Sequence, residues 1–125
     1  MNIFSFFAGA GFLDLGFELQ GNYNVVFVNE FHEAFNHIYR FARQNMGLQE
    51  PRYGHHIEDI TEYIDGKHED RLQRLINWVN ESKEEELTGF IGGPPCPDFS
   101  VAGKNRGRDG ENGRLSGTYA QLICT

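Results

Sequence analysis

The sequence predicts an α/β fold in which a mostly parallel sheet has helices on both faces. Short apolar runs typical of strands alternate with segments whose apolar residues recur at helical spacing. Strands are expected over 3–7, 25–28 and 87–91. Helix-containing connections between strands favour parallel pairing, and such sheets bind ligands at the carboxyl ends of their strands.

The amino-terminal elements follow from local patterns. Residues 3–7 lead into Gly9-Ala10-Gly11, and a helix follows until Gly21-Asn22 ends it. After the β-branched run 25–28, the next helix is indicated by apolar residues at helical spacing. These residues are Phe31, Phe35, Ile38, Tyr39 and Ala42.

The remaining pattern predicts three further elements. A very short strand is expected around Asp59-Ile60, after a polar stretch. An amphipathic helix is expected over 68–81, with Trp78 in the core, and a last helix begins within 115–123, where Cys124 packs as an apolar residue.

Composition fits one globular domain. The 125 residues are 39% hydrophobic, which is enough to form one core. The formal net charge of −7 argues against tight nucleic-acid binding by this segment alone. A local exception is the glycine-rich stretch that carries Lys104, Arg106, Arg108 and Arg114, which reads as a mobile basic loop.

Export and membrane insertion are not expected. No basic residue precedes the first apolar run, and glycines interrupt that run well short of a membrane span. Two cysteines, Cys96 and Cys124, form neither a disulfide framework nor a paired metal motif, which fits the cytoplasm. His55-His56 matches no common metal spacing, so we expect a solvated loop there and no metal.

The first candidate site is the run Phe7-Ala8-Gly9-Ala10-Gly11, between a strand and a helix. Glycines let the backbone approach a ligand, and the helix amino terminus offers N–H groups to a carboxylate or other anion. A tight structural turn is the alternative. Asp14 replaces the third glycine of a dinucleotide fingerprint, which disfavours a plain NAD site.

Glu30 and Phe31 directly follow the second strand. Glu30 lies nineteen positions beyond Gly11, where a carboxylate accepts hydrogen bonds from a ribose, and Phe31 has a ring able to cover an adenine. An acidic helix cap and a core phenylalanine are the alternatives. Together with the glycine turn, the pair indicates an adenosine-containing cofactor.

The third candidate is Cys96, in Gly92-Gly93-Pro94-Pro95-Cys96 at a strand end. Prolines fix the approach to the cysteine, and its thiolate would be the attacking species. A structural cysteine remains the alternative from these residues alone.

These motifs resemble, in order, those of the DNA (cytosine-5) methyltransferases. Residues 3–18 resemble the first family motif, 25–31 the second, Asp59-Ile60 the third, and 93–103 the catalytic Pro-Cys motif. The resemblance implies a partial Rossmann-like, S-adenosylmethionine-dependent methyltransferase fold. Residues 1–125 would be the amino-terminal part of the catalytic domain, without the target-recognition region and later motifs.

The resemblance also implies residue roles. Phe7, Ala8, Gly9 and Gly11 would form the S-adenosylmethionine turn, Glu30 would bind the ribose hydroxyls, and Phe31 the adenine face. Asp59 and Ile60 would contact the adenine edge. Pro95 would lie beside the cofactor and would meet the target cytosine together with the nucleophile Cys96. Ser100 would lie near the cofactor or the DNA backbone, and Lys104, Arg106 and Arg108 in a loop closing over double-stranded DNA.

Two positions depart from the family pattern. Pro97 stands where a glutamine most often follows the cysteine, and Phe12 stands where glycine is common. Because later motifs are missing, we expect little turnover from this chain alone. A missing carboxyl-terminal half or a complementary subunit is a possible partner.

The implied function is DNA cytosine-5 methylation, in a restriction-modification system, through a covalent Cys96 adduct with a flipped-out base. One alternative is a non-catalytic cofactor-binding or subunit-pairing half of a split methyltransferase. A nicotinamide oxidoreductase would leave Pro94-Pro95-Cys96 unexplained, and RNA methylation stays open.

Overall fold

The computed structural model describes residues 1–94 and 111–125, with the backbone alone for 111–113. Its elements run β1 (Asn2–Phe6), α1 (Phe12–Leu19), β2 (Asn24–Asn29), α2 (Glu33–Asn45), β3 (His55–His56), the 3-10 helix η1 (Ile60–Tyr63), α3 (Glu69–Glu85), β4 (Thr88–Gly92) and α4 (Glu111–Cys124).

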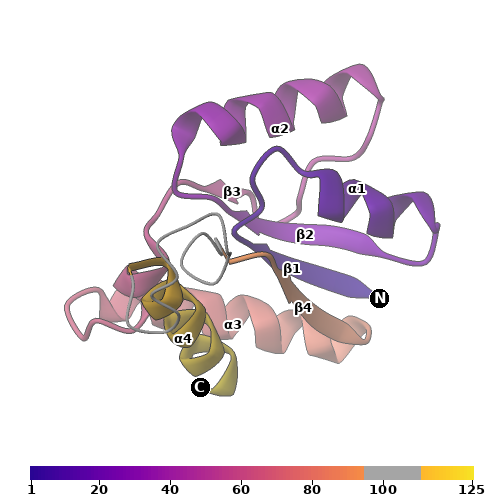
Figure 1. The fold of residues 1–125 in the computed structure, drawn as a ribbon. Helices are drawn as coiled ribbons and strands as arrows, with labels where there is room; N and C mark the ends of the chain where they lie inside the picture. Colours follow the sequence, from indigo (N-terminus) through magenta and orange to yellow (C-terminus); the bar gives the residue numbers. More distant parts are fainter. Residues whose placement is uncertain (95–110) are drawn as a thin grey trace.

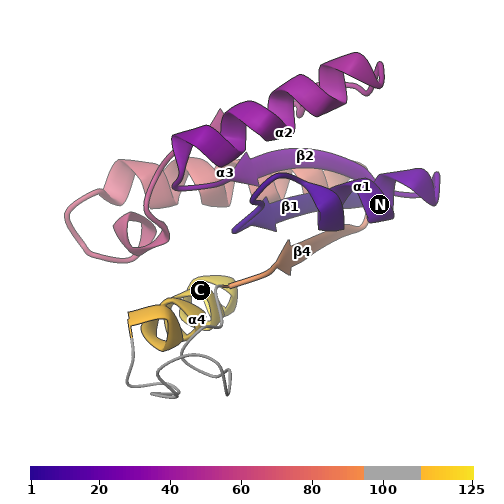
Figure 2. The same cartoon turned by 45° about the horizontal axis from the view of Figure 1, so that its top comes forward.

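Within these described residues the four strands form one parallel sheet in the order β3-β2-β1-β4. The helices α1 and α2 lie on one face, and α3 and α4 on the other (Figures 1 and 2). The expected α/β architecture, a parallel sheet with helices on both faces, is confirmed. The change of face between α2 and α3 reverses the strand order, as in doubly wound folds.

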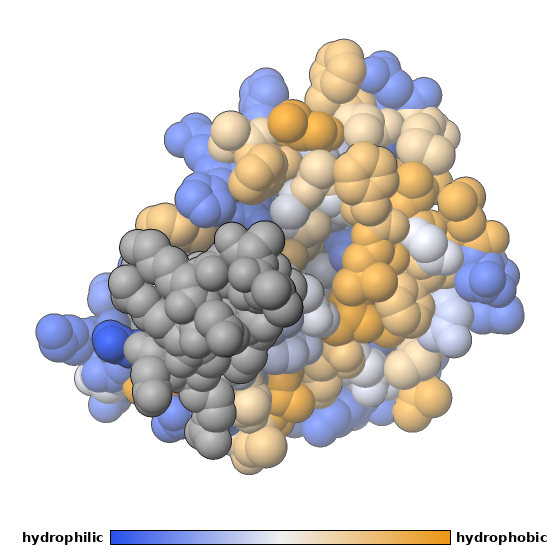
Figure 3. All heavy atoms as spheres, in the orientation of Figure 1, coloured by the Kyte–Doolittle hydropathy of each residue, from blue (hydrophilic) through white to orange (hydrophobic). Residues whose placement is uncertain are grey.

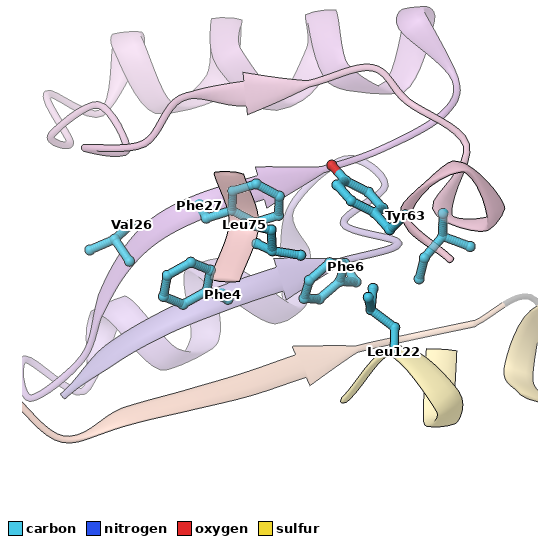
Figure 4. Packing of buried hydrophobic residues seen from close by; sticks show 8 residues of the cluster. Phe4, Phe6, Val26, Phe27, Tyr63, Leu75 and Leu122 are labelled. Carbon is cyan, nitrogen blue, oxygen red and sulfur yellow. The ribbon is translucent and has the colours of Figure 1, made fainter. Parts of the chain in front are cut away.

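The larger core cluster lies between the sheet and the helices α3 and α4. The ring of Phe27 of β2 stacks on that of Phe4 and lies tilted against that of Phe6, both of β1. These rings share the cluster with Leu75 and Leu122 (Figure 4). Each fully buried side chain of this size contributes about 1.5–3 kcal/mol. The expected helix over 68–81 is confirmed as α3, and Trp78 packs against this cluster.

The expected strand at Asp59-Ile60 is wrong. The strand is instead His55–His56, paired with Val28 and Asn29, and Asp59 caps η1. The solvated loop expected at His55-His56 is wrong for the same reason, and the His55 side chain is only 5% exposed. Ring contact with Tyr39 and a hydrogen bond with Asn36 hold this imidazole against α2.

The helix α2 is the largest departure from the sequence pattern. Of the five apolar residues that predicted it, only Tyr39 is buried. Its inward face is Asn36, Tyr39 and Arg43, whereas Phe35 and Ile38 lie on the outside, 47% and 52% exposed. The apolar colour that runs over α2 and down toward α1 in Figure 3 reflects this arrangement. Cys124, expected to pack inward, is likewise exposed on α4.

Candidate cofactor-binding site

The strand ends lie in register along one line. Phe6 pairs with Asn29 on one side and with Gly92 on the other, and Asn29 pairs with His56. Phe7, Glu30 and Gly93 come directly after this line. Parallel pairing therefore brings the glycine turn, the acidic residue and the approach to the cysteine to one edge of the sheet (Figure 1).

The glycine turn reverses the chain between β1 and α1 with three residues in the left-handed region. Phe7, Gly9 and Gly11 have φ values of 52°, 57° and 91°. Ala8 donates its N–H to the Asn29 carbonyl at 3.2 Å, which ties the turn to β2. The amino terminus of α1 begins directly after Gly11, so unpaired N–H groups of its first turn face this edge.

The two glycines have different surroundings. A Cβ atom on Gly9 would meet no atom within 4 Å, so this part of the turn is open to an approaching group. A Cβ atom on Gly11 would lie 2.5 Å from the ring of Tyr39. Gly9 thus leaves room for a ligand, and Gly11 leaves room for α2.

The carboxylate of Glu30 links this turn to the start of α2. It accepts hydrogen bonds from the N–H of Gly9 at 2.9 Å and from the N–H of His32 at 2.7 Å. Glu30 is 7% exposed, and an ionised carboxylate keeps further acceptor positions for hydroxyl groups. The ring of Phe31, next in sequence, is 59% exposed, which excludes the core-phenylalanine alternative.

Asn29 is a residue of this edge that sequence reasoning missed. Its buried side-chain amide donates to the carbonyl oxygens of His56 and Glu58, at 3.2 and 3.0 Å. This holds the segment before Asp59 beside β2. A polar residue at the end of an otherwise apolar strand was the available signal.

Asp59 and Ile60 lie at the same edge with their side chains engaged locally. The Asp59 carboxylate accepts from the N–H and the hydroxyl of Thr61, at 3.0 and 2.8 Å. Ile60 is buried in the larger core cluster. A ligand could therefore contact the backbone atoms of these two residues. Contact with the Asp59 carboxylate would require it to give up its hydrogen bonds to Thr61.

Several candidate residues lie outside the described part of the chain. These are Pro95, Cys96, Ser100, Lys104, Arg106 and Arg108. The end of β4 that precedes them is described, and Tyr119 of α4 packs there. A Cβ atom on Gly92 would lie 2.7 Å from Tyr119, whose ring also contacts that of Phe7.

A hollow of about 630 Å³ lies at the other end of the sheet, away from these motifs. It is lined by Asn2, Tyr23 and Asn24 at the amino ends of the strands, together with acidic side chains. We place the candidate site at the carboxyl edge instead, because the glycine turn and Glu30 meet there. Within residues 1–94 and 111–125, no group of three metal-binding side chains occurs, and no helix is long and apolar enough to span a membrane.

A parallel α/β sheet that has a glycine turn and a buried carboxylate at the carboxyl ends of its strands is an arrangement typical of nucleotide-binding folds. The chain belongs to the C-5 cytosine-specific DNA methylase family, whose model matches residues 1–125. The resemblance drawn from the four sequence motifs is thereby confirmed.

Named relatives are Type II methyltransferases. M.NmeDI from Neisseria meningitidis serogroup C is 51% identical over 98% of this chain and 28% of its own length. M.MthTI from Methanothermobacter thermautotrophicus is 32% identical over 98% of the chain and 30% of its own length. M.NgoPII from Neisseria gonorrhoeae is 35% identical over 98% of the chain and 29% of its own length. The chain thus spans less than a third of each of these relatives.

Proposed function

We propose that this chain is the cofactor-binding and nucleophile-bearing part of a DNA (cytosine-5) methyltransferase of a restriction-modification system. The observation that carries the proposal is the register line His56-Asn29-Phe6-Gly92, which brings to one edge the strand ends that lie within or just before the four family motifs. Family membership and the relatives' names support the reaction type.

S-adenosylmethionine fits the described residues at four points. Open space at Gly9 admits a ligand against the backbone, and the amino terminus of α1 suits the carboxylate of its methionine part. Glu30 offers acceptor positions to the ribose hydroxyls, and the exposed ring of Phe31 offers a flat apolar face to the adenine. When bound, this cofactor supplies an electrophilic methyl group.

In the proposed reaction Cys96 is the nucleophile. Its thiolate adds to C6 of a cytosine turned out of the duplex, and the electron pair displaced onto C5 takes the methyl group. The C5 proton then leaves, and the bond between sulfur and C6 breaks to restore the ring. Pro95 beside the cysteine would meet the base, and Ser100, Lys104, Arg106 and Arg108 would contact the double-stranded DNA.

We further propose that residues 1–125 do not turn over alone and need a carboxyl-terminal half or a complementary subunit. The basis is that the relatives are more than three times as long as the matched segment. The reaction would take place in the cytoplasm, where the target DNA lies.

Cofactor binding is tested by titrating the folded chain with S-adenosylmethionine in a calorimeter. We expect saturable binding that weakens more than tenfold in Glu30→Ala, because the variant loses acceptors for the ribose. Glu33→Ala, three positions away on the exposed start of α2, is the matched control and retains binding. Equal loss in both variants contradicts the assigned role of Glu30.

The reaction is tested by grafting residues 1–125 in place of the matching segment of M.NmeDI. Methylation of DNA by the chimera, abolished by Cys96→Ser and retained by the exposed Cys124→Ser, supports the proposal. A chimera that binds the cofactor but stays inactive with Cys96 intact favours the non-catalytic half. A duplex containing 5-fluorocytosine distinguishes a catalytic part from a non-catalytic half, because this base halts the reaction at the covalent stage and so traps an active chimera on the DNA.

A further inference from the structure

Beneath the glycine turn lies a chain of buried polar contacts that the proposed function leaves unused. Its centre is Tyr39 of α2, which is fully buried. The ring of this tyrosine fills the space that a side chain on Gly11 would take, with atoms 2.5 and 2.7 Å from the Cβ position. The turn therefore rests directly on an aromatic ring from another element.

The hydroxyl of Tyr39 is held as firmly as its ring. It donates to Oδ2 of Asp14 at 2.6 Å, and the hydroxyl of Ser5 donates to Oδ1 of the same carboxylate at 2.8 Å. Asp14 is 1% exposed and Ser5 is 1% exposed. One carboxylate thus joins β1, the first turn of α1 and α2 around the two ends of the glycine turn.

Burial makes this arrangement sensitive to the loss of one partner. Burial raises the pKa of the Asp14 carboxyl above its ordinary value, against the lowering effect of the hydrogen bonds from Tyr39 and Ser5. A buried acceptor that loses its donor costs free energy, because no water molecule is at hand to replace the lost hydrogen bond. The segment from Ser5 to Asp14 is therefore expected to shift when the tyrosine hydroxyl is removed.

We propose that Tyr39 is a positioning residue for the cofactor turn: through Gly11 and Asp14 it sets where the N–H groups at the start of α1 point. The inference rests on the proposed function, because it assigns those N–H groups to the methionine part of S-adenosylmethionine. Glu30 and Phe31, which would hold the adenosine part, contact neither Tyr39 nor Asp14 through any hydrogen bond or ring contact that the described residues show.

The first test needs no ligand. Amide hydrogen exchange is measured on the folded chain for Tyr39→Phe, with Tyr53→Phe as the matched control, since the Tyr53 hydroxyl donates to the Glu81 carboxylate on the exposed side of α3. We expect the amides of Gly9, Gly11 and Leu15 to exchange at least about threefold faster in Tyr39→Phe alone. An unchanged turn, or an equal increase along the whole chain, overturns the proposal.

The second test compares two ligands. Tyr39→Phe is expected to weaken S-adenosylmethionine about five- to tenfold, the effect of one hydrogen bond, and to leave adenosine within about twofold. Equal weakening of both ligands overturns the positioning role. If the unsubstituted chain binds neither ligand, the proposed cofactor site fails in this chain, and the exchange result decides about Tyr39 independently.

A graded series guards against a variant that does not fold. Ser5→Ala removes the other donor to Asp14 without touching the ring, and we expect the same pattern with a smaller amplitude. Tyr39→Leu removes ring and hydroxyl together and is expected to exceed Tyr39→Phe. An affinity for S-adenosylmethionine that follows thermal stability alone across the series, including Tyr53→Phe, would overturn the proposal.

Discussion

One carboxylate oxygen of Glu30 lies 2.9 Å from the backbone nitrogen of Gly9, and the other lies 2.7 Å from that of His32. The side chain at the end of β2 thus fixes both the turn that follows β1 and the start of α2. Glu30 is buried at a strand end and keeps further acceptor positions, so it meets this structural requirement and could also accept the ribose hydroxyls of the proposed cofactor.

The first prediction concerns the two glycines of the turn. Gly9→Ala is expected to lower the free energy of unfolding by about 1 kcal/mol, the cost of a positive φ for alanine. Gly11→Ala is expected to cost about 3 kcal/mol, because its Cβ also meets the ring of Tyr39. Urea denaturation measures both.

The effect on cofactor binding is expected to be larger for Gly9→Ala than its small effect on stability suggests. The methyl group that this substitution adds would point into open space at the proposed cofactor site, so calorimetry should show a loss of affinity for S-adenosylmethionine out of proportion to the loss of stability. Two variants of equal stability would contradict the packing role of Gly11.

Strong local signals made most of the fold predictable. The apolar run of β1 leads into closely spaced glycines, which favour a turn. One face of α3 is marked by Leu72, Leu75, Ile76 and Val79. The positions of Glu30 and of the glycine turn at one edge follow from parallel pairing. The candidate cofactor site was therefore predictable in outline.

Contacts distant in the sequence decided the rest. His55 belongs to a strand because Val28 and Asn29 offer a free parallel edge and Tyr39 packs on its ring, and neither is visible from the neighbours of His55. Likewise, the inward face of α2 is polar because its side chains bind polar partners on α1 and β3. These inward side chains are Asn36, Tyr39 and Arg43. Hydrophobic spacing cannot anticipate a helix whose buried face is polar.

The second prediction tests this orientation of α2. Phe35→Gln and Phe41→Gln are each expected to change the free energy of unfolding by less than about 0.5 kcal/mol, because these side chains are 47% and 64% exposed. Tyr39→Ala on the opposite side of the same helix is expected to cost about 3 kcal/mol or more. A large loss from either phenylalanine, measured by denaturation, would show that it is buried.

The third prediction is a pH dependence that arises from His55. Burial, and next the charge of Arg40, lower the pKa of this imidazole to about 4 in the folded chain, whereas an unfolded histidine titrates near 6.5. The unfolded chain therefore takes up the proton first as the pH falls. The stabilising contribution of neutral His55 is complete above about pH 6.5 and is lost as the pH falls toward 4.

The expected size of this loss is about 3 kcal/mol between pH 7 and pH 4. The measurement is the difference in unfolding free energy between the unsubstituted chain and His55→Gln at several pH values, which cancels other titrating groups. A difference that stays constant from pH 7 to pH 4 would show that His55 titrates normally in the folded chain.

The fourth prediction concerns the ion pair between Arg43 of α2 and Glu18 of α1, whose side chains are only 7% and 12% exposed. Arg43→Met leaves the Glu18 carboxylate without its counter-charge, and we expect a loss of about 3 kcal/mol of unfolding free energy. Glu18 also accepts from the N–H of Val25, so Glu18→Gln keeps an acceptor while removing the charge.

The double variant Arg43→Met/Glu18→Gln is therefore expected to be more stable than Arg43→Met alone, by about 1 kcal/mol or more, since no uncompensated charge remains inside. Denaturation of the four chains of this cycle measures the coupling. Additive losses would mean that water reaches Glu18 and that the two helices are held together by the contacts of Tyr39 and Asp14 without help from this pair.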